Sequence, residues 1–267
     1  MTITGEVAGV ASRVKRNSVL RGGARLGYAL SGVLHLLVAW IALQVAWSDS
    51  GRSADQSGAL ATLAGSSLGR LTLWVAVVGF VALAAWQLAI GLAARPDRGS
   101  SRWPAPVKGI AKAVLYLALG WASFNTAEGR PGNSRAQSAG ITATLLQHSG
   151  GALVVMLIGL VLIGAGGYHM LKGWTKMFLR DLTKHPGRFA VRAGVVGYLA
   201  KGVSLALVGV LFVIAAQDHT SARSTGLDGA LRLLRQQAFG PWLLPAVALG
   251  IAAYGLYSFA RARHARV

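Results

Sequence analysis

The sequence predicts an all-α integral membrane protein: a bundle of six transmembrane helices, formed by three tandem two-helix repeats, with short interfacial helices in the outer loops. Three observations support this fold class. Hydrophobic residues make up 54% of the 267-residue chain and charged residues only 13%, whereas soluble domains average about 25% charged residues. The apolar residues form six blocks of roughly 20, the length that crosses a hydrocarbon core of about 30 Å. A polar, weakly amphipathic segment separates two apolar blocks, and this pattern occurs three times.

The expected elements follow in chain order. The transmembrane helices are expected at residues 28–47, 71–92, 107–124, 151–171, 193–216 and 242–260. A basic tail is expected at residues 1–24. The helices that follow group into three repeats, at residues 25–95, 104–174 and 192–263. Amphipathic runs between the two helices of each repeat favour short helices that lie along the membrane interface. These runs cover residues 48–69, 138–148 and 226–239.

The basic residues predict the orientation of the helices. The formal charge is +19, and 20 of the 27 Lys and Arg residues lie in the N-terminal tail, around the loops between repeats, and at the C-terminus. Because cytoplasmic loops carry the excess of Lys and Arg, we expect a multi-pass protein of the cell membrane with both termini in the cytoplasm. The basic face should contact anionic lipids of the bilayer. This distribution explains the charge without a nucleic-acid partner.

The three repeats can be aligned on Gly69, Gly150 and Gly240. Upstream of these glycines, Gly58-Ala59-Leu60 then matches Gly229-Ala230-Leu231 without a gap. Because each repeat has two helices, every copy enters the membrane with the same topology, as parallel repeats do around an axis along the membrane normal. Three such units suggest a pseudo-threefold bundle, although the differences between copies also allow an irregular arrangement.

The third repeat carries the clearest motif. It contains Gly197, Tyr198, Lys201 and Gly202, then Ala230, Leu231 and Leu234, then Gly250, Tyr254, Gly255 and Tyr257. This tandem pattern resembles the bacterial membrane family called domain of unknown function 1206, over about residues 20–263. The resemblance implies six spanning helices and no established chemistry. The first copy has Ser31 in place of the lysine and the middle copy has Gly109 in place of the tyrosine, so the motif residues need not share one role in all three units.

Two lysines are candidate ligand or lipid contacts. Lys112 and Lys201 occupy the same repeat position, a few residues inside the cytoplasmic ends of their helices. An ionisable group inside a membrane helix is a functional candidate, because insertion there is unfavourable by about 2.5–3.5 kcal/mol at the helix centre. At this depth a lysine can also snorkel to the headgroups and contact anionic lipid. Both interpretations stay open.

Two histidines and three amides complete the candidate set. His35 and His169 lie where they could ligate haem or relay protons, but a neutral histidine packed against a neighbouring helix fits the sequence better. Gln44, Asn125 and Gln217 recur near the outer ends of three helices. They could form an amide ring around an axial path, or they could make ordinary helix-end hydrogen bonds. The glycines Gly164, Gly166, Gly167, Gly202, Gly209, Gly250 and Gly255 are expected at helix contacts, and Trp86, Tyr168, Tyr254 and Tyr257 in the interfacial aromatic belt.

No sequence feature predicts catalysis. The chain has no cysteine, which excludes thiolate metal sites and cysteine nucleophiles, and it has no phosphate-binding or zinc-protease motif. No metal site is expected, and haem is the only cofactor considered. We therefore expect a non-enzymatic scaffold, accessory or lipid-interacting protein, which could have a protein partner in the membrane. The alternatives are a transporter or channel for an anion or small solute, and a haem-binding electron carrier.

Overall fold

The computed structural model describes residues 17–48, 51–92 and 105–265. Each of six long helices is long and apolar enough to cross a membrane. These are α2 (Ser18–Trp47), α4 (Ser67–Leu92), α5 (Ala105–Ala127), α7 (Gly151–Trp174), α8 (Arg188–Gln217) and α10 (Gly240–His264). Across the described residues there is no β-strand, only an isolated bridge between Leu182 and Ala265. The predicted all-α, multi-pass membrane fold is confirmed.

The helices extend beyond their apolar blocks. Helix α2 begins at Ser18, ten residues before the expected start, because the Asn17 side chain accepts hydrogen bonds from the Val19 and Leu20 amides and so caps the first turn. Part of the expected basic tail is therefore helical. Helix α8 likewise begins at Arg188, within the basic loop. Hydropathy marks the membrane-crossing part of a helix, whereas caps and packing decide where the helix ends.

Short helices connect the two long helices of each repeat: α3 (Gln56–Ala64), α6 (Ser134–Leu146) and α9 (Gly226–Arg235), with a 3₁₀ turn η2 (Ser221–Arg223) before α9. They lie at the end of the molecule where α2, α5 and α8 stop, which we call the short-helix end. The opposite end, where α2 and α8 begin and α10 stops, is the basic end. Leu60 of α3 and Leu231 of α9 are buried, so these short helices pack on the long helices instead of lying free on lipid.

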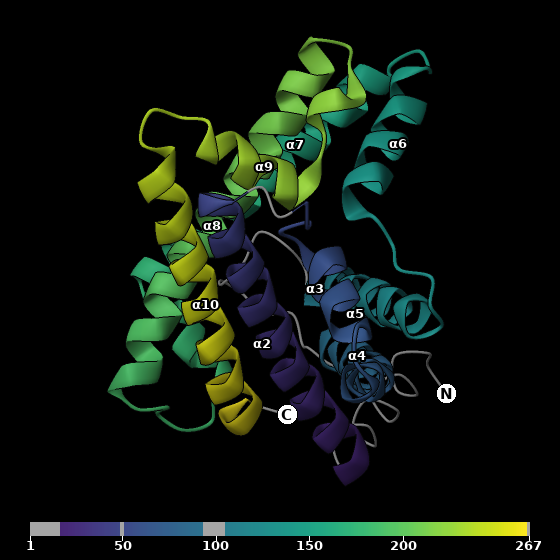
Figure 1. Ribbon diagram of the computed structural model, residues 1–267. Coiled ribbons are helices and arrows are strands. Elements are labelled where there is room, and N and C mark those ends of the chain that lie inside the picture. Colours follow the sequence, from purple (N-terminus) through teal and green to yellow (C-terminus); the bar gives the residue numbers. More distant parts are fainter. Residues whose placement is uncertain (1–16, 49–50, 93–104, 266–267) are drawn as a thin grey trace.

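The long helices pack as three pairs, and each pair joins neighbouring repeats. The second helix of one repeat packs on the first helix of the next: α4 on α5, α7 on α8, and α10 on α2. In Figure 1 the α2–α10 pair lies between the other two pairs, and contacts of α2 with α4 and of α10 with α8 join them. Helices α5 and α7 do not pack extensively on one another within the described residues. The pairing is cyclic, as a pseudo-threefold arrangement requires. However, the six long helices form an arc and not a closed ring; the arc is open between α5 and α7.

Glycines allow the close approach of helices within these pairs. A Cβ on Gly166 of α7 would lie 2.6 Å from the Gly202 carbonyl oxygen of α8, and one on Gly209 would lie 2.5 Å from the Gly159 carbonyl oxygen. Gly250 and Gly255 are equally close to neighbouring helices. The predicted packing role is thus confirmed for these glycines, and it is wrong for Gly164 and Gly167, which have no neighbouring atom within 4 Å of a Cβ. Small residues at helix crossings are the usual solution in lipid, where apolar association gives little driving force.

Candidate functional site

Cationic and aromatic side chains gather inside the arc toward the basic end. Four cations come from four different helices, and a loop carboxylate joins them. Tyrosines and histidines of α2, α7, α8 and α10 surround these groups. We call this cluster the basic chamber; its charged members are Lys112, Lys172, Asp181, Lys201 and Arg261, and its aromatic members are Tyr28, His35, His169, Tyr198, Tyr254 and Tyr257.

Lys201 of α8 points to α10 inside the bundle. Its Nζ donates a hydrogen bond to the Tyr254 hydroxyl at 3.3 Å and lies 4.3 Å from the centroid of the same ring, within the range of a cation–π interaction. The His35 ring of α2 is 4.7 Å from the Tyr254 ring. The side chain of Lys201 therefore connects two helices, in contrast to a lysine extended along the bundle surface.

Arg261 of α10 lies deeper in the bundle than a helix-terminal arginine would. Its guanidinium stacks 4.3 Å from the Tyr28 ring and donates to the Tyr28 hydroxyl at 3.4 Å. Gln87 of α4 donates to the same hydroxyl at 2.9 Å. The Nε of Arg261 and the Oε1 of Gln87 are buried and have no hydrogen-bond partner among the described residues. Buried polar atoms are normally paired, so this region has unused capacity for a polar ligand or water.

The loop between α7 and α8 folds back over the chamber. Its 3₁₀ turn η1 (Met177–Asp181) places Phe178, which is fully buried, between the rings of Tyr198 and Tyr257. The amide and the side-chain hydroxyl of Thr183 both donate to the His264 carbonyl and hold the loop against the end of α10. From the sequence this segment was expected only to be a basic loop. Its one detectable signal was the apolar run Met177-Phe178-Leu179 among basic residues.

Asp181 at the end of η1 supplies a carboxylate to the chamber. Its Oδ2 lies 2.7 Å from Lys172 Nζ. Partial burial raises the pKa of Asp181, but the charges of Lys172 and Arg261 outweigh burial and hold this pKa below its ordinary value of 3.8. The carboxylate therefore stays ionised at neutral pH.

Lys112 of α5 completes the set of cations. Its side chain is exposed, yet it interacts electrostatically with Arg261, Asp181, Lys172 and Tyr254. The side chain of Lys112 is therefore accessible and at the same time close enough to these groups to be influenced by their charges. Among the described residues, no carboxylate lies within ion-pairing distance of Lys112, Lys201 or Arg261. The chamber therefore has four cations for one carboxylate.

The two histidines contact different tyrosines. The Nδ1 of His35 donates to the Ser31 carbonyl at 2.6 Å, and that of His169 donates to the Ala165 carbonyl at 2.8 Å; the opposite nitrogen of each ring is not used by these bonds. The His169 ring stacks on Tyr198, 5.9 Å away, and no ring contact joins the two histidines. No cluster of three or more candidate metal ligands occurs among the described residues. Joint haem ligation by these histidines remains a prediction.

The three amides of the expected ring have different environments. Asn125 donates to the Trp121 carbonyl of its own helix at 3.1 Å, Gln217 is exposed at the end of α8, and the Oε1 of Gln44 is buried without a partner. No hydrogen bond between described residues joins any two of them. The amide ring around an axial path also remains a prediction.

The aromatic belt expected from the sequence is largely wrong. Trp86, Tyr254 and Tyr257 are 3%, 6% and 0% exposed, whereas Tyr168 is 53% exposed. These residues share related positions in the three repeats, and the difference follows from the open arc: α7, which carries Tyr168, has one face beside the gap. The sequence did contain a signal for the buried site. The residue after the equivalent aromatic position is polar in all three repeats: Gln87, His169 and Ser258.

A cavity of about 210 Å³ lies between α2, α8 and α10, next to Lys201. Its polar groups at the chamber side are Lys201, His35 and Tyr254. Further toward the short-helix end its walls are mostly apolar, and Gln56 of α3 and Leu227 of α9 line it there. The apolar lining residues are Leu34, Val38, Leu205, Val208 and Ile251.

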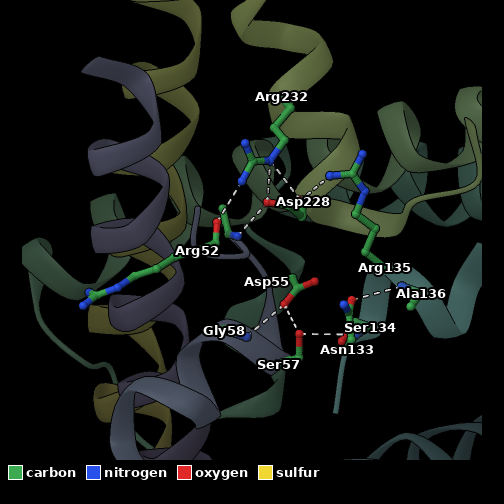
Figure 2. A network of polar contacts seen from close by, with 11 residues as sticks. Arg52, Asp55, Ser57, Gly58, Asn133, Ser134, Arg135, Ala136, Asp228 and Arg232 are labelled. Atoms are coloured by element: carbon green, nitrogen blue, oxygen red, sulfur yellow. Dashed lines mark hydrogen bonds and ion pairs between the residues drawn. The ribbon is translucent and has the colours of Figure 1, made fainter. Parts of the chain in front are cut away.

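A second polar network joins the three short helices at the opposite end (Figure 2). Asp228 of α9 is 1% exposed; it accepts hydrogen bonds from the Ala54 amide at 2.8 Å and from Arg232 Nε at 3.0 Å, and it pairs with Arg135 of α6 at 3.7 Å. Arg232 also donates to the Arg52 carbonyl at 2.9 Å. We call this group the Asp228 clamp. It fixes the first and third repeats to one another and ties α6 to both.

This arrangement defines a class: multi-pass membrane proteins with six helices, made of three tandem two-helix repeats around a basic chamber. The chain belongs to the family described as Domain of Unknown Function (DUF1206), which matches at residues 26–94, 107–176 and 196–265. The three matches confirm both the resemblance and the tandem repeats. The chain is also similar to "Uncharacterized protein YxxB" of Bacillus subtilis (strain 168), with 25% identity over 253 residues that cover 88% of this chain and 87% of that protein. No solved structure matches the chain.

Proposed function

We propose that this is a non-enzymatic, lipid-interacting protein of the cell membrane, with both termini in the cytoplasm, that holds the anionic head of a membrane amphiphile in the basic chamber. The observation that carries the proposal is the excess of cations: Lys112, Lys172, Lys201 and Arg261 converge from four helices, and among the described residues Asp181 is the one carboxylate beside them. Cations inside a membrane protein are unfavourable unless an opposite charge or a polar site compensates for them. An anionic head would supply that compensation.

The geometry of the helices gives such a ligand a lateral entrance. The arc is open between α5 and α7, and Lys112 is an exposed residue of α5. A lipid can enter from the membrane plane through such a gap, whereas a water-soluble ligand would have to pass the η1 loop. The basic residues of the loops around the chamber would concentrate anionic lipids at the same membrane face, by about 1 kcal/mol for each Lys or Arg near the surface.

The test uses the full-length protein in nanodiscs with equal parts of phosphatidylglycerol and phosphatidylcholine. Native mass spectrometry then counts the lipids that stay bound. Lys112→Met removes one chamber cation without removing a hydrogen bond between described residues, and we expect retention of phosphatidylglycerol to fall about fivefold, which corresponds to about 1 kcal/mol. Lys184→Met removes an exposed loop lysine as the matched control. Equal retention of both lipids by the unsubstituted protein, or equal effects of the two substitutions, would refute the proposal.

Anion transport is the second candidate, because the same cations could attract a small anion. Transport needs a path through the short-helix end, where Gln56 and Leu227 line the cavity and the Asp228 clamp joins the short helices. Because these helices are joined, we favour binding over transport. A liposome flux assay with chloride and phosphate distinguishes them: flux that falls with Lys201→Ala would replace the binding proposal with transport.

A further inference from the structure

We propose that the cavity between α2, α8 and α10 is an acyl-chain site for a single-chain fatty-acid-type amphiphile, whose carboxylate binds Lys201 and the Tyr254 hydroxyl. The inference rests on the proposed function, since it concerns the same chamber, and it adds the class of ligand. It depends on three properties of the cavity: the position of its polar groups, the hydrogen-bond donors that they offer, and its volume.

The charged group of the cavity lies at one end. On α2, His35 precedes Val38 in the direction of the short-helix end; on α8, Lys201 precedes Val208; and α10 runs the opposite way, with Ile251 before Tyr254. His35, Lys201 and Tyr254 therefore lie at one level, and the walls deeper in the membrane are apolar except for the neutral side chains of Ser204 and Gln56. An amphiphile would lie here with its charged end toward the basic end and its chain toward the membrane centre.

The donors at the polar end match a carboxylate. The Lys201 ammonium has three protons, and it donates one to the Tyr254 oxygen at 3.3 Å. The Tyr254 oxygen accepts that bond, so its own proton is left for another acceptor, and no acceptor for it occurs among the described residues. Ser204 is already engaged with the Ala200 carbonyl at 2.9 Å. Two donors, one on a cation and one on a neutral hydroxyl, suit the two oxygens of a carboxylate.

The size of the cavity favours one chain. Its volume is about 210 Å³, and a water molecule or a methylene-sized group occupies about 30 Å³, so the cavity holds about seven such groups. One chain segment fits, whereas two chains side by side do not. The remaining part of a longer chain would leave through the open side of the arc into lipid. Binding should therefore strengthen with chain length only until the cavity is full.

The experiment measures the binding of isotope-labelled saturated fatty acids with 4 to 16 carbons to the full-length protein in phosphatidylcholine nanodiscs. We expect affinity beyond simple membrane partitioning to rise up to about eight carbons and then to level off. Lys201→Met should weaken fatty-acid binding about 10- to 100-fold, the effect of losing hydrogen bonds to a charged group, and should not change the binding of 1-hexadecanol. Tyr254→Phe tests the second donor and should weaken binding by a smaller factor.

A matched pair of substitutions on α8 tests the cavity itself. Val208→Phe fills it, whereas Val210→Phe adds the same bulk at a position that is 41% exposed. We expect Val208→Phe alone to abolish the dependence on chain length, while both variants keep the unfolding temperature of the parent to within a few degrees. Equal effects of the two variants, or affinity that follows membrane partitioning at every chain length, would overturn the acyl-chain site.

The same variants separate this inference from the proposed function. If Val208→Phe has no effect but phosphatidylglycerol retention still depends on Lys112, the chamber binds anionic lipid heads and the acyl-chain site is wrong. If neither ligand depends on any chamber residue, both proposals fail. Inorganic phosphate serves as the chainless probe: tight phosphate binding that fatty acids do not displace would also overturn the fatty-acid assignment.

Discussion

The Asp228 clamp should decide whether the short-helix end stays closed. Asp228→Ala removes the acceptor of the Ala54 amide and leaves the Arg232 guanidinium without its carboxylate. Breaking a buried pair by removing one partner destabilises by about 3–5 kcal/mol. Arg232 is 23% exposed and keeps its bond to the Arg52 carbonyl, so we expect a smaller loss, about 2–4 kcal/mol for opening this end.

Because the chain has no cysteine, a single introduced thiol can report this opening. Ala59→Cys places the thiol on α3 at a site that is 0% exposed, where it reacts with a maleimide only when α3 moves away. If α3 recloses faster than the thiol reacts, the labelling rate follows the free energy of opening. Lowering that free energy by about 2–4 kcal/mol then raises the labelling rate about 30- to 700-fold. The measurement compares labelling rates with and without Asp228→Ala in the same nanodiscs.

Arg135→Ala is the control for this prediction. Its ion pair with Asp228 is longer, at 3.7 Å, and the Arg135 side chain is 49% exposed, so we expect less than about 1 kcal/mol and at most a fivefold faster rate. If Asp228→Ala leaves the rate within about threefold of the parent, or if the two substitutions act equally, Asp228 does not hold the short helices together.

The remaining predictions concern the basic end and the helix contacts. The pKa of Asp181 is lowered in the folded protein, so the stabilising effect of its carboxylate is present above about pH 3.8 and disappears as the pH falls through the folded pKa. Asp181→Asn should therefore reduce the loss of thermal stability between pH 6 and pH 3. An unchanged pH profile would contradict this. Gly166→Leu should destabilise the protein in chemical unfolding by about 1–3 kcal/mol through overpacking, whereas Gly164→Leu faces open space and should have little effect; the reverse order would show that α7 and α8 pack through another face. Phe178→Ala should destabilise the η1 loop by about 3–5 kcal/mol and speed its cleavage by trypsin, while Phe189→Ala, at a residue 73% exposed, should not; equal cleavage of the two variants would mean that the loop is not anchored by its buried ring.

The membrane fold could be predicted from the sequence because its causes are local. Six apolar blocks must become helices in lipid, since every backbone polar group there needs a partner within its own segment. The tandem repeats were equally visible, because equivalent glycines and aromatic residues recur in the same order and at nearly the same spacing within each copy. The sequence also identified Lys112, Lys201, His35 and His169 as unusual residues, because polar groups stand out in apolar helices.

The tertiary structure alone decided which of these residues meet. Lys201 contacts Tyr254 because α8 and α10 approach one another at Gly197 and Gly250. A hydropathy pattern does not predict the distance between two helices. Tyr254 and Tyr257 lie near a helix end, so the sequence assigned them to the interface; packing of α10 against α2 and α8 buried them instead.

The open arc also depends on tertiary packing. The sequence predicts similar repeats, but the two helices of one repeat pack on each other only in the first and third repeats, as α2 with α4 and α8 with α10. Within the described residues, α5 and α7 of the middle repeat do not pack extensively on one another. At equivalent positions of the three repeats, Trp86 and Tyr257 are consequently buried, whereas Tyr168 is exposed. The sequence by itself determined that the chain crosses the membrane in three similar units, because lipid acts on each apolar segment separately. Only the tertiary structure determined where those units leave a chamber and a gap, because these depend on contacts between segments far apart in the chain.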